Sequence, residues 1–115
     1  MSHERFQKCI QLCVSCAIEC SRCAAACLNE KDFEKLITCI KLDRDCAALC
    51  QVAVSAMSND NPLASQICDV CADMCDLCAE ECEKHKHHGH CKQCAEVCRN
   101  CAKECRLAIA PATIV

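Results

Sequence analysis

Cysteine dominates the chemistry that this sequence can perform, because 19 of its 115 residues are cysteine. Within four clusters, successive cysteines stand three, four or seven residues apart. The clusters comprise Cys9, Cys13, Cys16, Cys20, Cys23 and Cys27; Cys39, Cys46 and Cys50; Cys68, Cys71, Cys75, Cys78 and Cys82; and Cys91, Cys94, Cys98, Cys101 and Cys105. Soft thiolate sulfur binds Cu(I), zinc and iron–sulfur clusters. We therefore predict that all 19 cysteines are metal ligands.

Eight pairs of cysteines are separated by four residues, for example Cys71 and Cys75. On a helix the Cβ atoms of such a pair lie about 5–6 Å apart, whereas a disulfide needs them at about 3.5–4.5 Å. A helix therefore resists closing these pairs into disulfides and holds two sulfurs at a spacing that suits a metal with two ligands. Cu(I) accepts two ligands, whereas structural zinc and iron–sulfur clusters take four.

Charge also favours Cu(I) as the cofactor. Burying 19 thiolates without metal would be prohibitive, so the empty protein should hold neutral thiols. Each Cu(I) replaces one thiol proton, so a core with bridging thiolates stays near neutral at about one ion per cysteine. Zinc at that ratio would leave a large positive charge. We predict a non-enzymatic, high-capacity Cu(I) store, with a metallothionein-like zinc buffer as the alternative.

Three other uses of these cysteines are less consistent with their pattern. Cys-x-x-Cys pairs such as Cys13/Cys16 and Cys68/Cys71 occur in thiol oxidoreductases, but there the motif is usually single and at an exposed helix N-terminus. An iron–sulfur protein would need cysteines in groups of four. Free cysteine can simply pack as a small hydrophobic residue, yet alanine, leucine and valine would serve that purpose equally well.

Histidines form a second group of candidate ligands. His85 continues the cysteine stripe after Cys82, and His87, His88 and His90 follow directly. Imidazole is a competent copper ligand. We predict that His85, His88 and His90 bind metal or pass it inward, and the alternative for the last three histidines is a solvated polar loop.

Two further side chains lie on the stripe of the second cysteine cluster. Met57 is expected to pack, with metal binding as the alternative. Asp43 is expected to pair with a neighbouring base such as Lys41 or Arg44, or to be solvated. A role for Asp43 as a proton acceptor during metal loading is the alternative.

The spacing of the cysteines also predicts the elements that carry them. Steps of three and four average 3.5, which is the period of a stripe facing a partner helix. With polar runs as breaks, the pattern predicts helices at about 3–28, 32–57, 62–86 and 90–107. Short connections make consecutive helices antiparallel. The predicted fold is all-α, an antiparallel up-down-up-down four-helix bundle with a cysteine-lined core.

This topology places the histidines at one end of the bundle and Phe6, Met57 and Leu107 at the other. We expect one domain over residues 1–115, with 110–115 as a frayed tail. Apolar residues beside the cysteines complete the packing or, alternatively, support oligomerisation. They are Ile10, Val14, Ala17 and Ala24 in the first helix and Ile40, Ala47 and Val54 in the second.

Composition excludes several classes of function. The net charge is −3 and the chain has two Phe and no Trp or Tyr, so neither a basic patch nor aromatic platforms for nucleic acid are present. The N-terminal residues lack the apolar run of a signal peptide, and we expect no membrane span. We expect a cytoplasmic protein, where thiols are kept reduced and a disulfide framework is rare.

The sequence resembles the bacterial copper storage proteins, Csp, in the cytosolic branch that lacks a signal peptide. The resemblance covers nearly the whole chain and rests on the residues 39–46 leading to Ala56-Met57, on 67–85, and on His90-Cys91-Lys92-Gln93-Cys94-Ala95. It implies a four-helix bundle that binds many Cu(I) ions, mainly through cysteine pairs four residues apart. It also implies a homotetramer and copper entrance at the end that carries His85 to His90. We further expect exchange of copper with a donor or acceptor protein.

Overall fold

A computed structural model describes residues 2–110, with side chains from residue 5 onwards. Four α-helices and one short 3₁₀ helix account for most of these residues. They are α1 (Ser2–Leu28), η1 (Phe33–Leu36), α2 (Ile37–Ser58), α3 (Ala64–Glu83) and α4 (Gly89–Ile109). The predicted tail beyond residue 110 lies outside the described residues.

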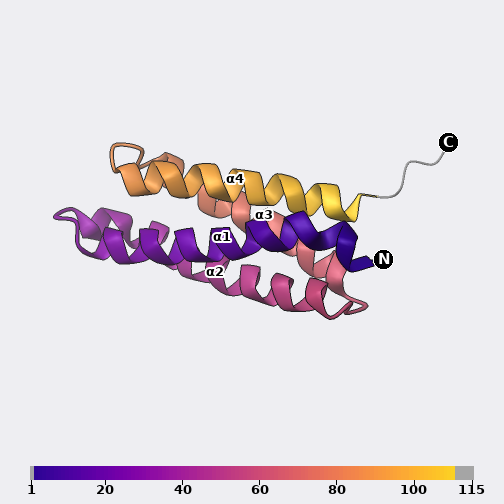
Figure 1. Ribbon diagram of the computed structural model, residues 1–115. Coiled ribbons are helices and arrows are strands. Elements are labelled where there is room, and N and C mark those ends of the chain that lie inside the picture. Colours follow the sequence, from indigo (N-terminus) through magenta and orange to yellow (C-terminus); the bar gives the residue numbers. More distant parts are fainter. Residues whose placement is uncertain (1, 111–115) are drawn as a thin grey trace.

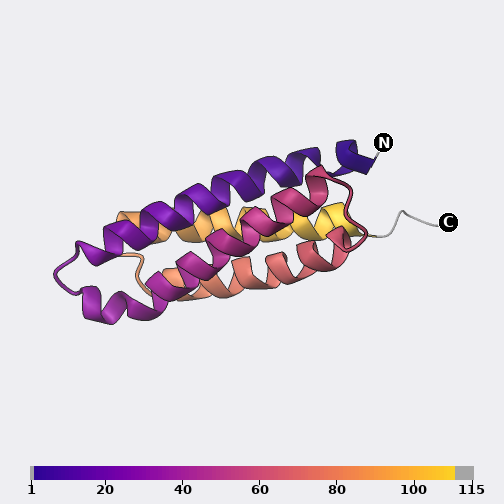
Figure 2. The same ribbon diagram turned by 90° about the horizontal axis from the view of Figure 1, so that it is seen from below.

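The four helices run up and down alternately in one elongated bundle of 52 × 27 × 17 Å (Figures 1 and 2). α1 packs against α2 and α4, and α3 packs against the same two helices. The α1–α2 and α3–α4 connections therefore lie at one end of the bundle, and the α2–α3 connection lies at the other together with the start of α1 and the end of α4 (Figure 1). The predicted fold class and topology are confirmed.

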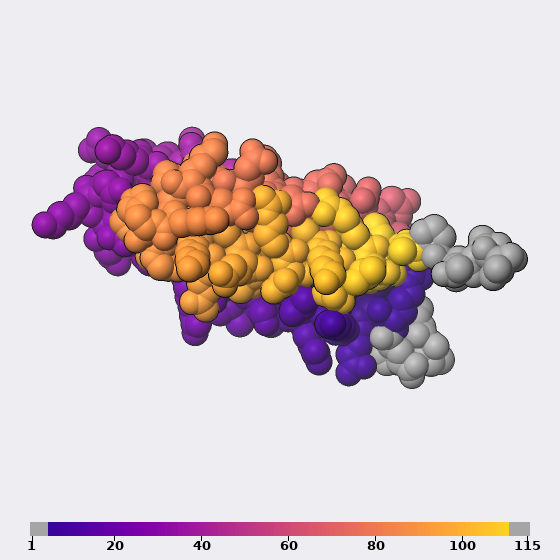
Figure 3. Space-filling model, turned by 90° about the horizontal axis from the view of Figure 1, so that it is seen from above, coloured from indigo at the N-terminus to yellow at the C-terminus, as the bar shows by residue number. Residues whose placement is uncertain are grey.

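All 19 cysteines point into the core, where each is at most 1% exposed. The 3.5-residue spacing explains this, because it keeps one stripe of each helix directed at the bundle axis. Alanines flank the stripe, for example Ala72 and Ala79 in α3 and Ala95 and Ala102 in α4, and all four are buried. On the face drawn in Figure 3, α4 and its neighbours close over this core along the length of the molecule.

The helix boundaries differ from the predicted ones mainly at the histidine end. The second predicted helix begins as the 3₁₀ helix η1 before α2. The third ends at Glu83, three residues earlier than predicted, and turns follow before α4. His85 therefore lies beyond the end of α3 and does not continue its cysteine stripe as a helical residue.

Salt bridges on the outside connect α3 with α4. Arg99 pairs with Asp76 and Glu83 at 3.0 and 2.8 Å, and Arg106 pairs with Asp73 at 3.0 Å and also with Asp76. These contacts link residues 73–83 of α3 with residues 99–106 of α4.

One segment, Arg5–Leu28, is long and apolar enough to cross a membrane by length and composition alone. No such segment was predicted from the sequence. Its apolar character comes in large part from six cysteines, all of which are buried against the other helices. A core helix of a soluble protein meets the same criteria, so the finding carries little weight against the bundle.

Candidate metal-binding core

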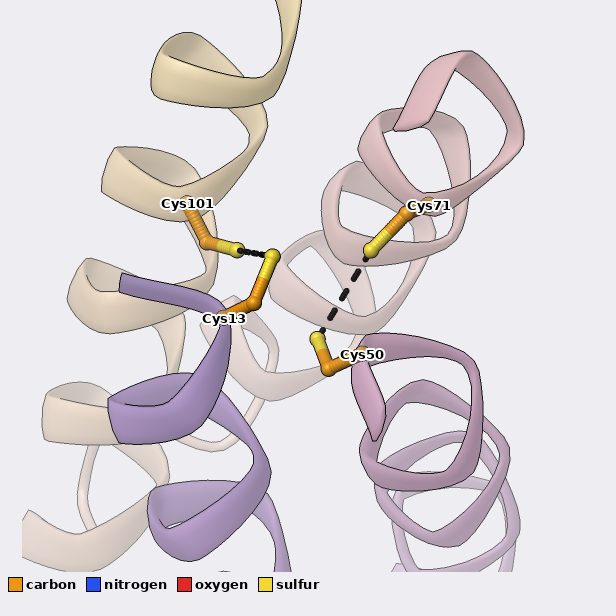
Figure 4. Close-up of side chains that lie close together, drawn as sticks. All are labelled: Cys13, Cys50, Cys71 and Cys101. Carbon is orange, nitrogen blue, oxygen red and sulfur yellow. Dashed lines mark hydrogen bonds between the residues drawn. The ribbon is translucent and has the colours of Figure 1, made fainter. Parts of the chain in front are cut away.

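The cysteines of all four helices converge on the bundle axis. Figure 4 shows one such group, Cys13 of α1, Cys50 of α2, Cys71 of α3 and Cys101 of α4. The Sγ atoms of Cys13 and Cys101 lie 3.6 Å apart, and those of Cys50 and Cys71 lie 3.7 Å apart. All four sulfurs are within 4.8 Å of one another, so one ion could contact several of them at once.

Such four-cysteine groups overlap along the core. Cys50 also belongs to a group with Cys16, Cys46 and Cys75, and Cys16 and Cys46 belong in turn to another. The third group consists of Cys16, Cys46, Cys20 and Cys98. A fourth group contains Cys20 and Cys98 again, together with Cys78 and Cys94. Because neighbouring groups share sulfurs, the core is one continuous thiol lattice rather than a set of separate four-coordinate sites.

Contacts between helices are as close as contacts within them. Among the pairs four residues apart, the Sγ atoms of Cys16 and Cys20 are 3.9 Å apart and those of Cys94 and Cys98 are 4.0 Å apart. Across helices, the Sγ–Sγ distance is 3.4 Å for Cys9 and Cys105 and also 3.4 Å for Cys39 and Cys82. Every cysteine is a free thiol. An ion bound to one thiol therefore has further sulfurs within reach, both on the same helix and on neighbouring helices.

Burial favours the protonated form of these groups while the core is empty. It raises the pKa of the Cys27 thiol, because a thiolate there would lose its contact with water. A Cu(I) ion that binds such a protonated thiol must displace the proton, so that a sulfur–copper bond replaces a sulfur–hydrogen bond.

Asp43 lies inside this lattice, and the predicted pairing with Lys41 or Arg44 is wrong. Its side chain is fully buried, whereas both bases are exposed. Oδ1 accepts hydrogen bonds from the thiols of Cys78 and Cys94 at 3.2 and 3.4 Å. Burial raises the pKa of Asp43 to about 8. The carboxyl group therefore keeps its proton at neutral pH, which removes the need for a cationic partner.

His90 is the histidine that reaches the thiols. Its Nδ1 lies 3.5 Å from the Sγ of Cys91, 3.7 Å from that of Cys23 and 3.8 Å from that of Cys27. These four residues form a group that could hold a metal ion. On the other side of the ring, Nε2 lies 2.9 Å from Oε2 of Glu30.

The other predicted histidine ligands contact carboxylates at the same end. His88 places Nε2 3.1 Å from Oδ1 of Asp32 and Nδ1 3.2 Å from Oε2 of Glu30. His85 places Nε2 3.0 Å from Oε2 of Glu81. His87 is mostly exposed, with Nε2 3.8 Å from Asp32.

Electrostatics at this end follow from these pairs. Desolvation lowers the pKa of His88, but the hydrogen bond to Asp32 and the charge of Glu30 outweigh it, so the pKa is raised. The same hydrogen bond lowers the pKa of Asp32. Glu30, Asp32 and Glu81 were not predicted as site residues. The first two lie in the connection that the topology brings to the histidines, and Glu81 precedes His85 by four residues.

The opposite end of the core is closed by apolar side chains. Met57 is fully buried and Phe6 is 4% exposed. Arg5 lies over the Phe6 ring, 4.8 Å from its centroid, and its Nε donates a hydrogen bond of 2.7 Å to the carbonyl oxygen of Ala108. Met57 therefore packs in the core, as expected.

Comparisons with known proteins agree on one family. The family model described as "Copper storage protein" matches residues 2–110. The Cu(I)-bound copper storage protein BsCsp3, from Bacillus subtilis, is 43% identical over 92% of this chain and 99% of its own, with a TM-score of 0.88. A cytosolic copper storage protein from Streptomyces lividans, loaded with five coppers, is 35% identical over 97% of this chain and 98% of its own, with a TM-score of 0.91. An uncharacterised cysteine-rich protein of Bacillus subtilis, YhjQ, is 45% identical over 75% of this chain and 79% of its own.

Proposed function

The chain belongs to the copper storage protein family, and on that premise we propose that it stores Cu(I) on the thiolates of its 19 cysteines, at about one ion per cysteine. The observation that carries the proposal is the continuous lattice of free, fully buried thiols contributed by all four helices. A carrier of a single ion would need only one pair of these cysteines.

The chemistry of loading follows from the state of the empty core. Each Cu(I) bonds to a thiol sulfur and releases the thiol proton to solvent, so the charge of the core does not change. The metallothionein-like zinc buffer receives no support, because the copper storage structures reported above contain copper.

The ligand set consists of the 19 cysteines together with His90. Three thiols surround Nδ1 of His90 within hydrogen-bonding distance, which supports this role directly. His85 and His88 belong to the entrance instead, because their ring nitrogens contact carboxylates rather than thiols. We therefore assign them to the capture of copper ions at the mouth, which we define as Glu30, Asp32, His85, His87, His88 and His90.

We further propose that the protein is not an enzyme, resides in the cytoplasm, exchanges copper with a donor or acceptor protein, and forms a homotetramer. An apolar groove between α1 and α2, lined by Val14, Ala17, Ile18, Gln51 and Val54, supports self-association. Val14 and Ile18 are 43% and 49% exposed in the single chain. Analytical ultracentrifugation of the wild type and of Ile18→Lys tests this, since a tetramer built on this groove dissociates when a charge is placed in it.

The storage function is tested by anaerobic titration of the fully reduced protein with Cu(I) against a chromophoric chelator. The expected endpoint is about 19 ions per chain, one per cysteine, before the chelator gains colour. An endpoint of one or two ions would make the protein a carrier. A parallel titration with Zn(II) in competition with Cu(I) separates the copper store from a zinc buffer.

A further inference from the structure

Glu30 lies at the mouth, where its carboxylate contacts histidines and not thiols. It belongs to the connection between α1 and η1, and its Oε2 is shared by His88 of the α3–α4 connection and His90 of α4. Nε2 of His90 is 2.9 Å away and Nδ1 of His88 is 3.2 Å away. The carboxylate therefore connects two segments that are about sixty residues apart in the sequence.

The contact with Glu30 determines which nitrogen of His90 carries a proton. An ionised carboxylate can only accept hydrogen bonds. Nε2 of His90 must therefore be the donor, and in the neutral ring Nδ1 then presents a free lone pair. That lone pair faces Cys23, Cys27 and Cys91. Ligating histidines in general donate their second ring N–H to a carboxylate or carbonyl, which fixes the ring orientation and strengthens the ligand.

We propose that Glu30 is a positioning residue for copper loading, which holds His90 with Nδ1 directed at the outermost thiols of the core. Glu30 acts through His90 and does not itself reach the thiols. The inference rests on the proposed function, because it requires that copper passes His90 on its way inward.

His88 holds Glu30 in turn, and Asp32 holds His88. Nδ1 of His88 contacts the same oxygen of Glu30, and Nε2 of His88 donates to Asp32 at 3.1 Å. The rings of His88 and His90 are stacked, with centroids 5.4 Å apart and planes inclined by 21°. Asp32, His88 and Glu30 thus form one chain of contacts that ends at His90, and Glu30 is the member of this chain that hydrogen-bonds to His90.

The test compares Glu30→Ala with Glu30→Gln. The amide oxygen of glutamine still accepts a hydrogen bond from Nε2 of His90 but carries no charge. Stopped-flow mixing of reduced protein with Cu(I) bound to bicinchoninate measures the first loading phase. We expect Glu30→Ala to slow this phase about tenfold, and Glu30→Gln to stay within about twofold of the wild type. Equal slowing by both variants would show that Glu30 attracts the cation by charge, and would overturn the positioning role.

A matched control and a direct spectroscopic measurement complete the design. Glu34→Ala removes an exposed carboxylate of η1 at the same end and should leave the rate unchanged. In ¹H–¹⁵N spectra of the empty protein, the Nε2–H of His90 should be visible in the wild type and Glu30→Gln, and lost to solvent exchange in Glu30→Ala. A visible Nε2–H signal in Glu30→Ala would contradict the proposal even if loading were slow.

The double variant Glu30→Ala/His90→Ala separates this inference from the function on which it rests. If Glu30 acts through His90, its removal has no further effect on the rate once His90 is gone. An additional tenfold loss in the double variant would overturn the inference. If His90→Ala alone loads at the wild-type rate, both the inference and the role of His90 fail, whereas an unchanged final copper count would leave the storage function intact.

Discussion

The two ends of the bundle differ although the thiol lattice continues to both. At one end, Cys23, Cys27 and Cys91 are covered by His90, a polar side chain with one nitrogen facing inward. At the other end, Cys9 and Cys105 form a similar contact between α1 and α4, 3.4 Å from sulfur to sulfur. There the covering residues are Phe6 and Met57, and Arg5 is bonded across to α4.

The helices and their heptad spacing determine where the thiols lie, and we propose that the covering residues determine where an ion enters. A cation approaching the mouth meets imidazole and carboxylate groups that can replace its solvent ligands one at a time. A cation approaching the opposite end meets apolar surface, and the thioether of Met57 there is fully buried. We refer to these two ends as the mouth and the apolar plug, the plug being Phe6 and Met57.

The largest expected effect comes from opening the apolar plug. Met57→Ala removes a fully buried side chain, and we expect it to lower the free energy of unfolding by about 2–5 kcal/mol through lost burial and the cavity left behind. Denaturant unfolding of the reduced, empty protein measures this value. Leu107→Ala at the same end is the control, because a side chain that is 59% exposed should cost about 0.5 kcal/mol or less. A similarly small loss for Met57→Ala would mean that the end is not tightly packed.

A smaller effect should distinguish the two ends during loading. Cys23→Ala/Cys91→Ala at the mouth and Cys9→Ala/Cys105→Ala at the apolar plug each remove one α1–α4 thiol pair. Both should lower the capacity by about two ions, one per cysteine removed. Only the mouth variant should slow the first loading phase, by about tenfold, because His90 then lacks two of its neighbouring thiols. Stopped-flow loading and the chelator titration measure both quantities.

Equal slowing by the two cysteine variants would contradict the distinction between the ends, since copper would then enter from either side. Loss of all copper binding in either variant would contradict the distributed lattice. In that case a few cysteines would hold the ions and the remainder would serve as packing.

Much of this arrangement follows from the sequence because a periodic stripe specifies which face of a helix is buried. The steps of three and four predicted the inward position of every cysteine, and the short connections predicted that the histidines lie opposite Phe6 and Met57. The register between helices is not encoded in such a stripe. The close contacts between Cys39 and Cys82, or Cys9 and Cys105, therefore became apparent only in three dimensions.

The mouth and Asp43 were predicted least well, for two physical reasons. The conformation of a connection depends on contacts with distant segments, so the pairing of Glu30 and Asp32 with His88 and His90 could not be derived from local spacing. For Asp43, the sequence suggested a charged group in need of a base. The structure buries it beside Cys78 and Cys94, where desolvation keeps the carboxyl protonated and the thiols act as its donors.

The smallest expected effect concerns the salt bridges that hold α3 against α4 on the mouth side. Arg99 lowers the pKa of Glu83 by donating two hydrogen bonds to its carboxylate, at 2.8 and 3.1 Å. Because the pKa is lower in the folded protein, the stabilisation is present at neutral pH and is lost as the pH falls through the folded pKa. Both side chains are about one third or more exposed, so we expect Arg99→Ala to cost less than about 1 kcal/mol at pH 7.

The pH dependence of that loss separates a salt bridge from simple packing. Urea unfolding of the empty protein at pH 7 and again well below the ordinary glutamate pKa of about 4.3 should show the difference between wild type and Arg99→Ala shrinking in acid. Arg22→Ala, at an exposed position of α1, controls for the loss of one positive charge. If the difference in unfolding free energy between wild type and Arg99→Ala persisted in acid, the aliphatic part of the Arg99 side chain would be responsible for it. The mouth side of the α3–α4 pair would then be held by packing, like the apolar plug.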